Sequence, residues 1–390
     1  MKILTALTYY APHISGLTVY ARRVVRAMVE RGHEVTVLTS HYDRSLPREE
    51  IIDGAKVVRV PVLFRFSKGV LMPTLPWHAA RLTLSHDIVY LHLPQFEASV
   101  TAIMARFLAR KPIITSHQCD VLLPNRTIRL LFWPPIAASH RIAAALSNQI
   151  VALSRDYAEN SAFLRRYTHK LLTVYPPIPD LQPDPSNRLN LRERYGLDNC
   201  RLVGFVGRLA EDKGVHYLID AVPQVLERFP DARFLLVGEK EKVIGETVYE
   251  RLKDKIDSLG EHVVSLGVLP DTQLAEFYPE CEVLVLPSIN STEAFGMVQV
   301  EAMLKGTPVV ATDLPGVRVA VTVTGMGEIV PPRDDKALAQ AIIRVMSSRS
   351  SYVKPPEDIK RIFDPRKTYD FYEDLFSAQL GIPSPSAEST

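Results

Sequence analysis

Short runs of apolar residues alternate with amphipathic stretches along the first half of the chain. The runs predict strands at residues 2–8, 34–40, 56–62, 87–93 and 112–117. Residues 18–32 carry apolar side chains at helical spacing, from Val19 to Val29, and end at Gly32, where a helix commonly closes. Residues 96–110 predict a second helix. Strands that are almost continuously apolar are buried on both faces, so this pattern predicts a parallel sheet covered by helices.

The second half repeats the same alternation. It predicts strands at residues 201–208, 232–238, 263–267, 283–288 and 307–312, with helices at 216–229, near 247–259 and near 271–279. Between the halves, residues 175–187 contain five prolines in thirteen positions, which disfavours any regular element. We therefore expect an α/β protein of two doubly wound Rossmann-like domains that face each other across a cleft. Its ligand site is expected at the carboxyl ends of the strands.

Size and composition agree with this organisation. A chain of 390 residues is longer than one hydrophobic core usually supports. Cys119, Cys200 and Cys281 lie far apart and form no C-x-x-C pair, so neither a disulfide framework nor a zinc site is expected. The amino terminus is better explained by a buried first strand than by a signal peptide, and no apolar run reaches the ~18 residues of a membrane span. A cytoplasmic setting fits best.

Charge is distributed unevenly along the chain. Residues 1–180 hold 22 Lys and Arg against 12 Asp and Glu, a net of +10, and the remaining residues hold 24 against 32, a net of −8. The two halves then either meet different partners or differ in surface charge without functional meaning. The sequence leaves both interpretations open.

Residues 206–214, VGRLAEDKG, follow a predicted strand and precede a predicted helix. Arg208 and Lys213 would lie at the carboxyl edge of the sheet, close to the positive end of that helix. An arginine fork and a lysine point charge suit a diphosphate. Two solvated surface cations would give the same pattern, so the segment alone does not decide.

Residues 293–301, EAFGMVQVE, place two carboxylates eight positions apart. On one helix they would be rotated by a net ~80° and would not share a face. If the helix begins at about Phe295 or Gly296, Glu293 lies in the loop before it and Glu301 in its second turn. The first helical amides, which lack partners within a helix, then lie between the two acids and suit an anion. The plainer interpretation is an acid placed favourably before a helix start, with apolar residues packing the core.

These segments together resemble the retaining, nucleotide-sugar-dependent glycosyltransferases of family 4, which have the GT-B fold. The resemblance rests on the E-x7-E spacing, the preceding LPSINST, the following EAMLKGTPVVATDLPGV, the upstream GRLAEDKG and the N-terminal YYAPHISGLTVYARRVVRAMVERGHEVTVLT. It spans roughly residues 2–345 and is looser between about 41 and 175. Five motifs in order at fitting distances are specific where one would be weak.

The resemblance implies roles for the second half of the chain. Arg208 and Lys213 would neutralise the donor diphosphate, Glu301 would accept hydrogen bonds from the ribose hydroxyls, and Glu293 would lie beside the donor sugar. The donor-binding backbone between the acids would be that of Phe295, Gly296, Met297 and Val298. Val268 would hold the nucleobase through main-chain contacts.

In the first half, the resemblance places His117 beside the hydroxymethyl group of the donor sugar, although alone it would more often be a structural histidine. Asp120, on the same loop, could orient the acceptor hydroxyl. Gly16 would allow the donor to approach closely, while Ser15, where the family commonly has glycine, would narrow or hydrogen-bond the pocket. The EKEK at 239–242 also departs from the family pattern and puts donor contacts from that loop in doubt.

The resemblance also gives the domains their roles. The predicted division is an acceptor-side N-terminal domain at 1–175, a Pro-rich linker at 176–187, a nucleotide-sugar-binding domain at 188–363, a helix at 364–380 that crosses back to the first domain, and a disordered tail at 381–390.

The expected reaction is transfer of a hexose-type sugar from a UDP- or GDP-sugar to a hydroxyl acceptor. No Asp-x-Asp motif is present, so we expect no obligatory metal and no other cofactor, with Arg208, Lys213 and helix amides stabilising the leaving group. The family retains anomeric configuration, and a leaving phosphate oxygen could take the acceptor proton. A nucleotide-sugar epimerase or phosphorylase, or a non-catalytic nucleotide-binding module, remains an alternative. A dinucleotide oxidoreductase is disfavoured because no G-x-G-x-x-G follows the first strand.

The acceptor side is indicated by residues 122–148, where three arginines stand among leucines and aromatics. Cations beside exposed apolar residues could seat the protein on an anionic membrane, at the inner face of the plasma membrane, and would favour a lipid-linked acceptor. The alternative is a core helix interrupted by Pro134 and Pro135. No feature suggests a nucleic-acid partner.

Overall fold

The computed structural model describes residues 1–66, 68–123, 126–240 and 248–383, and for residues 126–128 it describes the backbone alone. The chain folds into two compact units. Unit 1 comprises Met1–Pro177 and Pro365–Thr390, and unit 2 comprises Ile178–Asp364. The first boundary lies inside the proline-rich segment. Residues 384–390, most of the tail predicted to be disordered, lie outside the described residues.

Unit 1 is built on an eight-stranded sheet in the order β10-β9-β8-β7-β1-β2-β4-β3. Its strands are β1 (Lys2–Ala6), β2 (Glu34–His41), β3 (Glu49–Ile52), β4 (Ala55–Pro61), β7 (Ile88–Leu93), β8 (Ile113–His117), β9 (Gln149–Ala152) and β10 (Leu171–Thr173). The pairings are parallel except for the edge strand β3, which runs antiparallel to β4. A separate hairpin joins β5 (Phe64–Phe66) to β6 (Gly69–Leu71).

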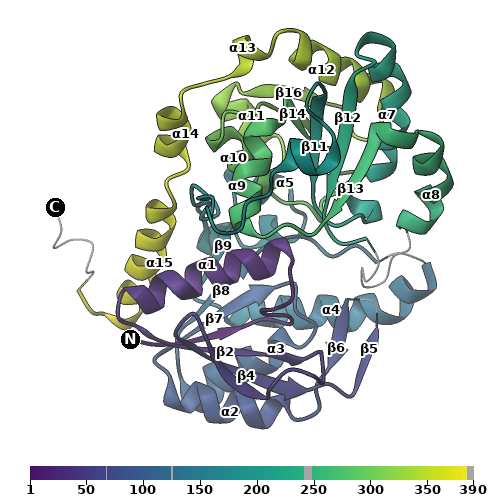
Figure 1. The fold of residues 1–390 in the computed structure, drawn as a ribbon. Helices are drawn as coiled ribbons and strands as arrows, with labels where there is room; N and C mark the ends of the chain where they lie inside the picture. Colours follow the sequence, from purple (N-terminus) through teal and green to yellow (C-terminus); the bar gives the residue numbers. More distant parts are fainter. Residues whose placement is uncertain (67, 124–125, 241–247, 384–390) are drawn as a thin grey trace. The chain divides into compact units, whose positions relative to one another are not determined.

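Helices cover both faces of this sheet (Figure 1). The helices of unit 1 are α1 (Gly16–Glu30), α2 (Leu75–Ser85), α3 (Ala98–Ile103), the π-helix η1 (Met104–Ala109), α4 (Arg126–Leu146), α5 (Arg155–Asn160), the 3-10 turns η2 (Leu164–Arg166) and η3 (Thr168–Lys170), and α15 (Pro365–Leu380). Residues of α2, α3 and α4 share one core with the strands. On the other face α15 packs beside α1, so the last helix of the chain completes the unit that contains the first strand.

Unit 2 contains a six-stranded, wholly parallel sheet in the order β13-β12-β11-β14-β15-β16. Its strands are β11 (Arg201–Val206), β12 (Ala232–Val237), β13 (Val263–Gly267), β14 (Val283–Leu286), β15 (Val309–Thr312) and β16 (Gly327–Val330). Its helices are α6 (Leu191–Tyr195), the 3-10 turn η4 (Glu211–Lys213), α7 (Val215–Arg228), α8 (Val248–Ser258), the 3-10 turn η5 (Gly260–His262), α9 (Asp271–Glu280), α10 (Met297–Leu304), α11 (Val319–Thr324), α12 (Asp335–Ser347), α13 (Arg349–Tyr352) and α14 (Pro356–Ile362). Figure 1 shows α7 and α12 on one side of the sheet and α9, α10 and α11 on the other.

The predicted strands form where the sequence placed them, and both sheets have helices on both faces. The predicted helix at 96–110 is also present, but its second half is the π-helix η1 rather than a continuation of α3. Pro134 and Pro135 do not interrupt a helix as one interpretation had it, because α4 runs continuously through both. Because proline has no N–H, the carbonyls four residues earlier, those of Leu130 and Leu131, lose their helical donors. Both residues lie on the exposed part of the helix.

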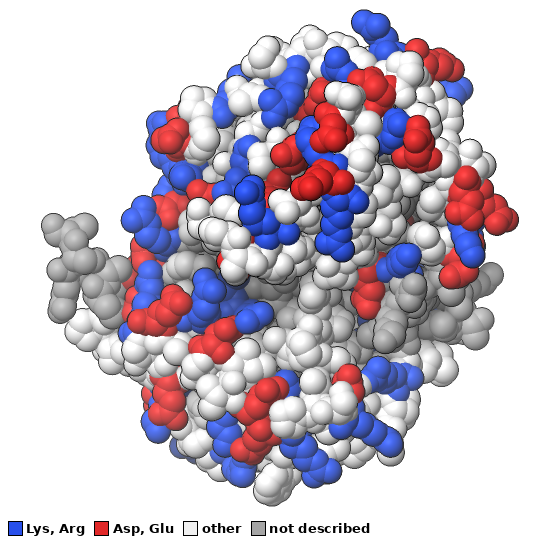
Figure 2. Space-filling view, in the orientation of Figure 1, with Lys and Arg blue, Asp and Glu red and all other residues white. Residues whose placement is uncertain are grey.

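One face of the molecule shows how charge is distributed over unit 2. On the face shown in Figure 2, basic and acidic side chains are interspersed over unit 2 rather than gathered by sign. Among the residues described, no helix is both long enough and apolar enough to cross a membrane.

Candidate active site

Arg208 and Lys213 lie in the segment that joins β11 to α7, at the carboxyl edge of the unit 2 sheet. This segment ends at Gly214, whose φ is +68°. A Cβ at Gly214 would lie 1.9 Å from the carbonyl oxygen of Pro287, so only glycine lets the segment pack against the chain after β14. The close packing brings the segment against the loop that carries Glu293.

Lys213 forms an ion pair with Glu293. Both side chains are largely buried, with 20% and 14% exposed. Burial alone would lower the pKa of Lys213, but the charges of Glu293 and Asp212 outweigh it and raise that pKa above its ordinary value. Lys213 is therefore a permanent cation whose counter-charge is the acid predicted to lie beside the sugar.

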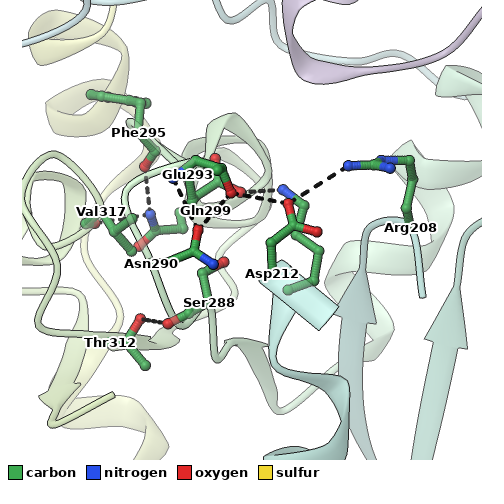
Figure 3. A network of polar contacts seen from close by, with 11 residues as sticks. Arg208, Asp212, Ser288, Asn290, Glu293, Phe295, Gln299, Thr312 and Val317 are labelled. Atoms are coloured by element: carbon green, nitrogen blue, oxygen red, sulfur yellow. Dashed lines mark hydrogen bonds and ion pairs between the residues drawn. The ribbon is translucent and has the colours of Figure 1, made fainter. Parts of the chain in front are cut away.

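Asp212 connects Arg208 to the loop that carries Glu293 (Figure 3). Its Oδ2 lies 3.6 Å from a terminal nitrogen of Arg208 and 3.1 Å from the hydroxyl of Thr292. That hydroxyl is also 2.7 Å from Oδ1 of Asn290, and the amide of Ile289 donates to the carbonyl of Asp212. Arg208 and Lys213 are thus held by one network that ties the two loops together.

The helix after Glu293, α10, begins at Met297, one or two residues later than the start at Phe295 or Gly296 that the sequence suggested. Its N-cap is Gly296, with φ +76°, where a Cβ would lie 2.3 Å from Cδ2 of Leu286. The fully buried amide of Gln299 donates to the carbonyls of Phe295, at 2.8 Å, and Val317, at 3.0 Å. Glycine and glutamine together fix the turn from which α10 begins.

Glu301 lies in the second turn of α10 and is 6% exposed. The hydroxyl of Tyr278, on α9, donates to its Oε2 at 2.8 Å. This bond sets the orientation of the carboxylate. Met297 and Val298 are partly buried and Phe295 is fully buried against Phe363, so the apolar residues between the acids do pack the core as well.

Val268 follows β13 directly and is 53% exposed, so its main chain lies at the carboxyl edge of the sheet. The loop after β12 also reaches this edge, where the carbonyl of Glu239 accepts a hydrogen bond from the amide of Leu209. Residues 241 and 242 of the EKEK stretch lie outside the described residues.

Within unit 1, His117 is the last residue of β8 and is 2% exposed. Its Nε2 lies 3.2 Å from Oδ1 of Asp120, and the same carboxylate oxygen accepts from Ser161 at 2.9 Å. Burial would raise the pKa of Asp120, but hydrogen bonds from His117, Ser161 and Tyr157 outweigh it and hold that pKa below its ordinary value. Nδ1 of His117 is buried and has no hydrogen-bond partner in the described part of the chain. The aspartate therefore orients the ring and leaves one nitrogen for another group.

Gly16 is the first residue of α1, after the loop that follows β1. A Cβ at this position would meet nothing within 4 Å, so the space beside it is open. Ser15 is the N-cap of α1, and its hydroxyl oxygen accepts from the amide of Thr18. The serine that replaces a family glycine is therefore engaged in capping its own helix.

The structure thus groups Arg208, Lys213 and Glu293 in one network in unit 2 and pairs His117 with Asp120 in unit 1. Sequence reasoning missed Asp212, Thr292, Gln299 and Tyr278, which hold the predicted residues in place. Asp212 and Thr292 stood inside the two motifs already singled out. Their spacing gave no indication that the motifs touch each other.

Two family models match the chain. Residues 187–361 match the model for glycosyl transferases group 1, and residues 15–177 match a glycosyl transferase 4-like domain. The two matches divide the chain close to the boundary between units 1 and 2.

Relatives and solved structures agree with these models. The chain is 34% identical to a D-inositol 3-phosphate glycosyltransferase of Corynebacterium urealyticum over 85% of its length and 82% of the relative's. It is 28% identical to a phosphatidyl-myo-inositol mannosyltransferase of Mycobacterium leprae, covering 90% and 89% of the two chains. The structure of Anabaena HepE, solved with UDP and glucose, superposes with a TM-score of 0.77 at 22% identity, covering 97% of this chain and all of the other. The family resemblance drawn from the motifs is confirmed: the chain belongs to the family 4-like group 1 glycosyl transferases, has their GT-B fold of two Rossmann-like domains, and is a glycosyltransferase.

Proposed function

We propose that the protein transfers a hexose-type sugar from a UDP- or GDP-sugar to a hydroxyl acceptor, with retention of anomeric configuration and without a metal ion. The observation that carries this proposal is the network in which Arg208, Lys213 and Glu293 meet at the start of α10. Two cations and a helix N-terminus suit a diphosphate, and an acid at their side suits sugar hydroxyls.

The leaving group is the step that such a site must stabilise. As the bond between the anomeric carbon and the phosphate oxygen breaks, negative charge grows on the diphosphate. Arg208 and Lys213 are held in place before the donor arrives, and fixed charges of this kind lower a barrier by several kcal/mol. The acceptor oxygen forms the new bond on the same face of the sugar, and its proton passes to the leaving phosphate oxygen.

The remaining residues bind and orient the donor in this proposal. Glu301, fixed by Tyr278, accepts hydrogen bonds from the ribose, and the main chain at Val268 holds the base. Nδ1 of His117, which lacks a partner among the described residues, is suited to a hydroxyl of the donor sugar. Asp120 orients that ring and aids the acceptor hydroxyl, and Gly16 provides open space for the donor.

A UDP-sugar is the favoured donor because Anabaena HepE, which shares the fold, was solved with UDP and with UDP-glucose. A panel of UDP, GDP and ADP tested by calorimetry on the wild type and on Arg208→Ala tests the donor site. We expect one nucleotide to bind and the variant to weaken it about tenfold or more. Equal affinity in both proteins would remove Arg208 from the site.

Product analysis separates a transferase from its alternatives. A transferase given the preferred nucleotide sugar and an acceptor releases the nucleoside diphosphate and a new glycoside. An epimerase instead gives an isomeric nucleotide sugar, a phosphorylase requires phosphate to form a sugar phosphate, and a binding module gives no product. The same assay run with EDTA tests the metal: activity should persist, and loss reversed by Mg²⁺ would refute a metal-free reaction.

The acceptor is proposed to be lipid-linked, because one relative is named for phosphatidyl-myo-inositol. Residues 98–146 of unit 1 contain six Lys and Arg and a single acid, Asp120. Phe107, Leu130 and Leu131 of this stretch are 69%, 79% and 66% exposed, although the side chain of Arg126 lies outside the described residues. Exposed apolar residues among cations suit the surface of an anionic bilayer.

Membrane contact is tested by flotation with vesicles of phosphatidylglycerol and phosphatidylcholine. The wild type should float with the anionic vesicles, and Leu130→Ser with Leu131→Ser should reduce this several-fold. Ile329→Ser, an exposed apolar residue of β16 in unit 2, is the matched control. Equal flotation of all three proteins would locate the contact elsewhere.

A further inference from the structure

Unit 1 has a pocket of about 230 Å³ that none of the residues assigned to the transferase site lines. It lies between the edge strand β3, its neighbour β4 and the first turns of α2. Its volume is below the roughly 300 Å³ at which pockets for drug-sized ligands and cofactors begin, so it is too small for a nucleotide sugar. A small group would fill it.

The walls of this pocket are cationic. Arg48, Arg59 and Arg81 line it against a single carboxylate, Glu49. Glu49 pairs first with Lys56, at 2.8 Å, and reaches Arg81 only at 3.7 Å. Among the residues that the structure describes, Arg48 forms no ion pair. The pocket therefore holds more positive charge than its acid can neutralise.

Arg59 is buried, with its side chain fully removed from solvent. Its terminal nitrogens donate to the carbonyls of Pro47, at 2.8 Å, and Ala11, at 2.9 Å, and pair with Glu50. Its Nε has no hydrogen-bond partner anywhere in the described residues. A buried donor without an acceptor is costly, and an acceptor entering the pocket would remove that cost.

The helical wall contributes His78 and Trp77. Nδ1 of His78 is a second buried atom without a partner among the described residues. Burial and the positive charges of Arg81 and Arg48 lower the pKa of His78, and together they outweigh the opposite effect of Glu49. Trp77 is 61% exposed, and the guanidinium of Arg81 lies 5.2 Å from its ring centre. The mouth of the pocket thus presents an aromatic face beside a cation.

We propose that this pocket binds the phosphate group of a phosphate ester. Arg48, Arg81, Arg59 Nε and His78 Nδ1 supply more donors than the two oxygens of a carboxylate can accept, and a tetrahedral phosphate can use them from several directions. Trp77 packs against the carbon skeleton that carries the phosphate. Arg59 also donates to the carbonyl of Ala11, in the loop between β1 and α1. A phosphate bound to Arg59 therefore stabilises that loop as well.

The phosphate has two sources, a soluble ester and the head group of an anionic lipid. The chain has only two tryptophans, Trp77 and Trp133, so their indole N–H signals in a ¹H–¹⁵N spectrum report on the pocket separately from α4. The spectrum is recorded with saturating UDP, so that phosphate bound in the donor site does not contribute. Trp77→Phe assigns the signal.

Titration with glycerol 3-phosphate should shift the Trp77 signal saturably, with a Kd in roughly the millimolar range expected for so small a ligand. The double variant Arg48→Gln with Arg81→Gln should weaken this at least tenfold. Arg26→Gln with Arg155→Gln removes the same charge from two exposed surface pairs of unit 1 and should leave binding unchanged. Equal melting temperatures of the variants exclude unfolding as the cause.

Vesicles distinguish the sources. Fluorescence is read in Trp133→Phe, where Trp77 is the only tryptophan. If the phosphate belongs to a lipid, phosphatidic acid vesicles shift Trp77 fluorescence to shorter wavelength, phosphatidylcholine vesicles do not, and Arg48→Gln with Arg81→Gln loses the response. If the ester is soluble, glycerol 3-phosphate moves the Trp77 signal and the vesicles have no effect. A Trp77 signal that responds to neither ligand, or that responds equally in the double variant, overturns the proposal.

Discussion

Asp212 shows at the scale of one residue how an acid can serve a site for an anion. It lies between Arg208 and Thr292 and so holds the guanidinium in place, but its own charge opposes that of a diphosphate. Asp212→Asn removes the charge and weakens the hold on Arg208, because an amide oxygen is a weaker acceptor than a carboxylate for a guanidinium. We expect a nucleoside diphosphate to bind equally or more tightly while kcat falls about tenfold, because Arg208 is no longer oriented for the transition state. Calorimetry and kcat measured on the same preparation test this split, and loss of affinity with unchanged kcat would contradict it.

Glu293 is the partner of Lys213 and the acid proposed to face the sugar. Glu293→Gln keeps the shape of the side chain and removes its charge. Lys213 then turns to the diphosphate, so affinity for the nucleotide should stay constant or rise, while kcat falls on the order of 100-fold as sugar contacts weaken. Lys213→Ala, measured in parallel, should lose nucleotide affinity instead. The reverse pattern would exchange the roles of the two residues.

Glu97, 9% exposed at the start of α3, gives the stability of the fold a pH dependence. Burial outweighs the hydrogen bond that it accepts from the amide of Met72 and raises its pKa from 4.5 to about 7. The folded state therefore holds this proton over a range where the unfolded state has lost it. Stability falls as pH rises from about 4.5 to about 7, by on the order of 2 kcal/mol.

Glu97→Gln should remove that slope, because a glutamine oxygen can still accept from Met72 but does not titrate. Urea unfolding at about pH 5 and about pH 8 measures the difference. The exposed Glu30→Gln on α1 is the control and should keep the wild-type slope. A slope that persists in Glu97→Gln would assign the pH dependence to another group.

At the scale of the element, α10 depends on its N-cap. Gly296 combines a left-handed φ with a Cβ position that Leu286 and Gln299 already occupy. Gly296→Ala should therefore cost about 2 kcal/mol or more in unfolding free energy, and turnover with it. Two other glycines separate the cost of the left-handed φ from the cost of the Cβ clash. Gly306 has φ +78° but open space for a Cβ, and Gly16 has open space and no left-handed φ. Urea unfolding should rank the three alanine variants in that order, and an unperturbed Gly296→Ala would show that the turn can relax.

The elements that could be predicted from the sequence are those with a strong period. β14, VLVL, is a continuous apolar run, and α7 repeats its apolar residues every three to four positions. The edge strand β3 was missed because EEII is half polar and half exposed, so nothing distinguishes it from a loop. Pro134 and Pro135 were expected, in one interpretation, to interrupt the helix. They do not, because the two carbonyls that lose a helical hydrogen bond lie on the exposed part of α4, where water can donate to them instead.

The candidate site divides in the same way. Arg208, Lys213 and Glu293 carry charge in ordered motifs, so both their chemistry and their place at the sheet edge could be inferred from the sequence. Gln299 and Tyr278 act through hydrogen bonds to residues 4, 18 and 23 positions away, and no spacing rule encodes such contacts. Whether the two domains face each other across a cleft stays a prediction.

At the scale of the whole molecule, unit 1 is assembled from the two ends of the chain. The carboxylate of Glu373, on α15, accepts from Arg31 at 2.5 Å and lies 2.8 Å from Nε2 of His33. The hydroxyl of Tyr372 lies 2.5 Å from that of Tyr20 in the buried core. Unit 2 contains neither contact, so the stability of unit 1 alone should depend on α15.

Glu373→Gln tests this dependence, because it leaves Arg31 with only the more exposed Asp370 among its carboxylate partners in the described residues. Breaking a largely buried pair is expected to cost unit 1 about 2 kcal/mol. Hydrogen exchange measured by mass spectrometry should then speed up in β1, β7 and β8 and stay unchanged in β11 and β12, with nucleotide affinity retained. Glu357→Gln, an exposed acid of α14, is the control and should alter neither unit. Equal acceleration in both sheets would mean that the two units unfold as one cooperative body, and the stability of the donor site would then depend on the last helix as well.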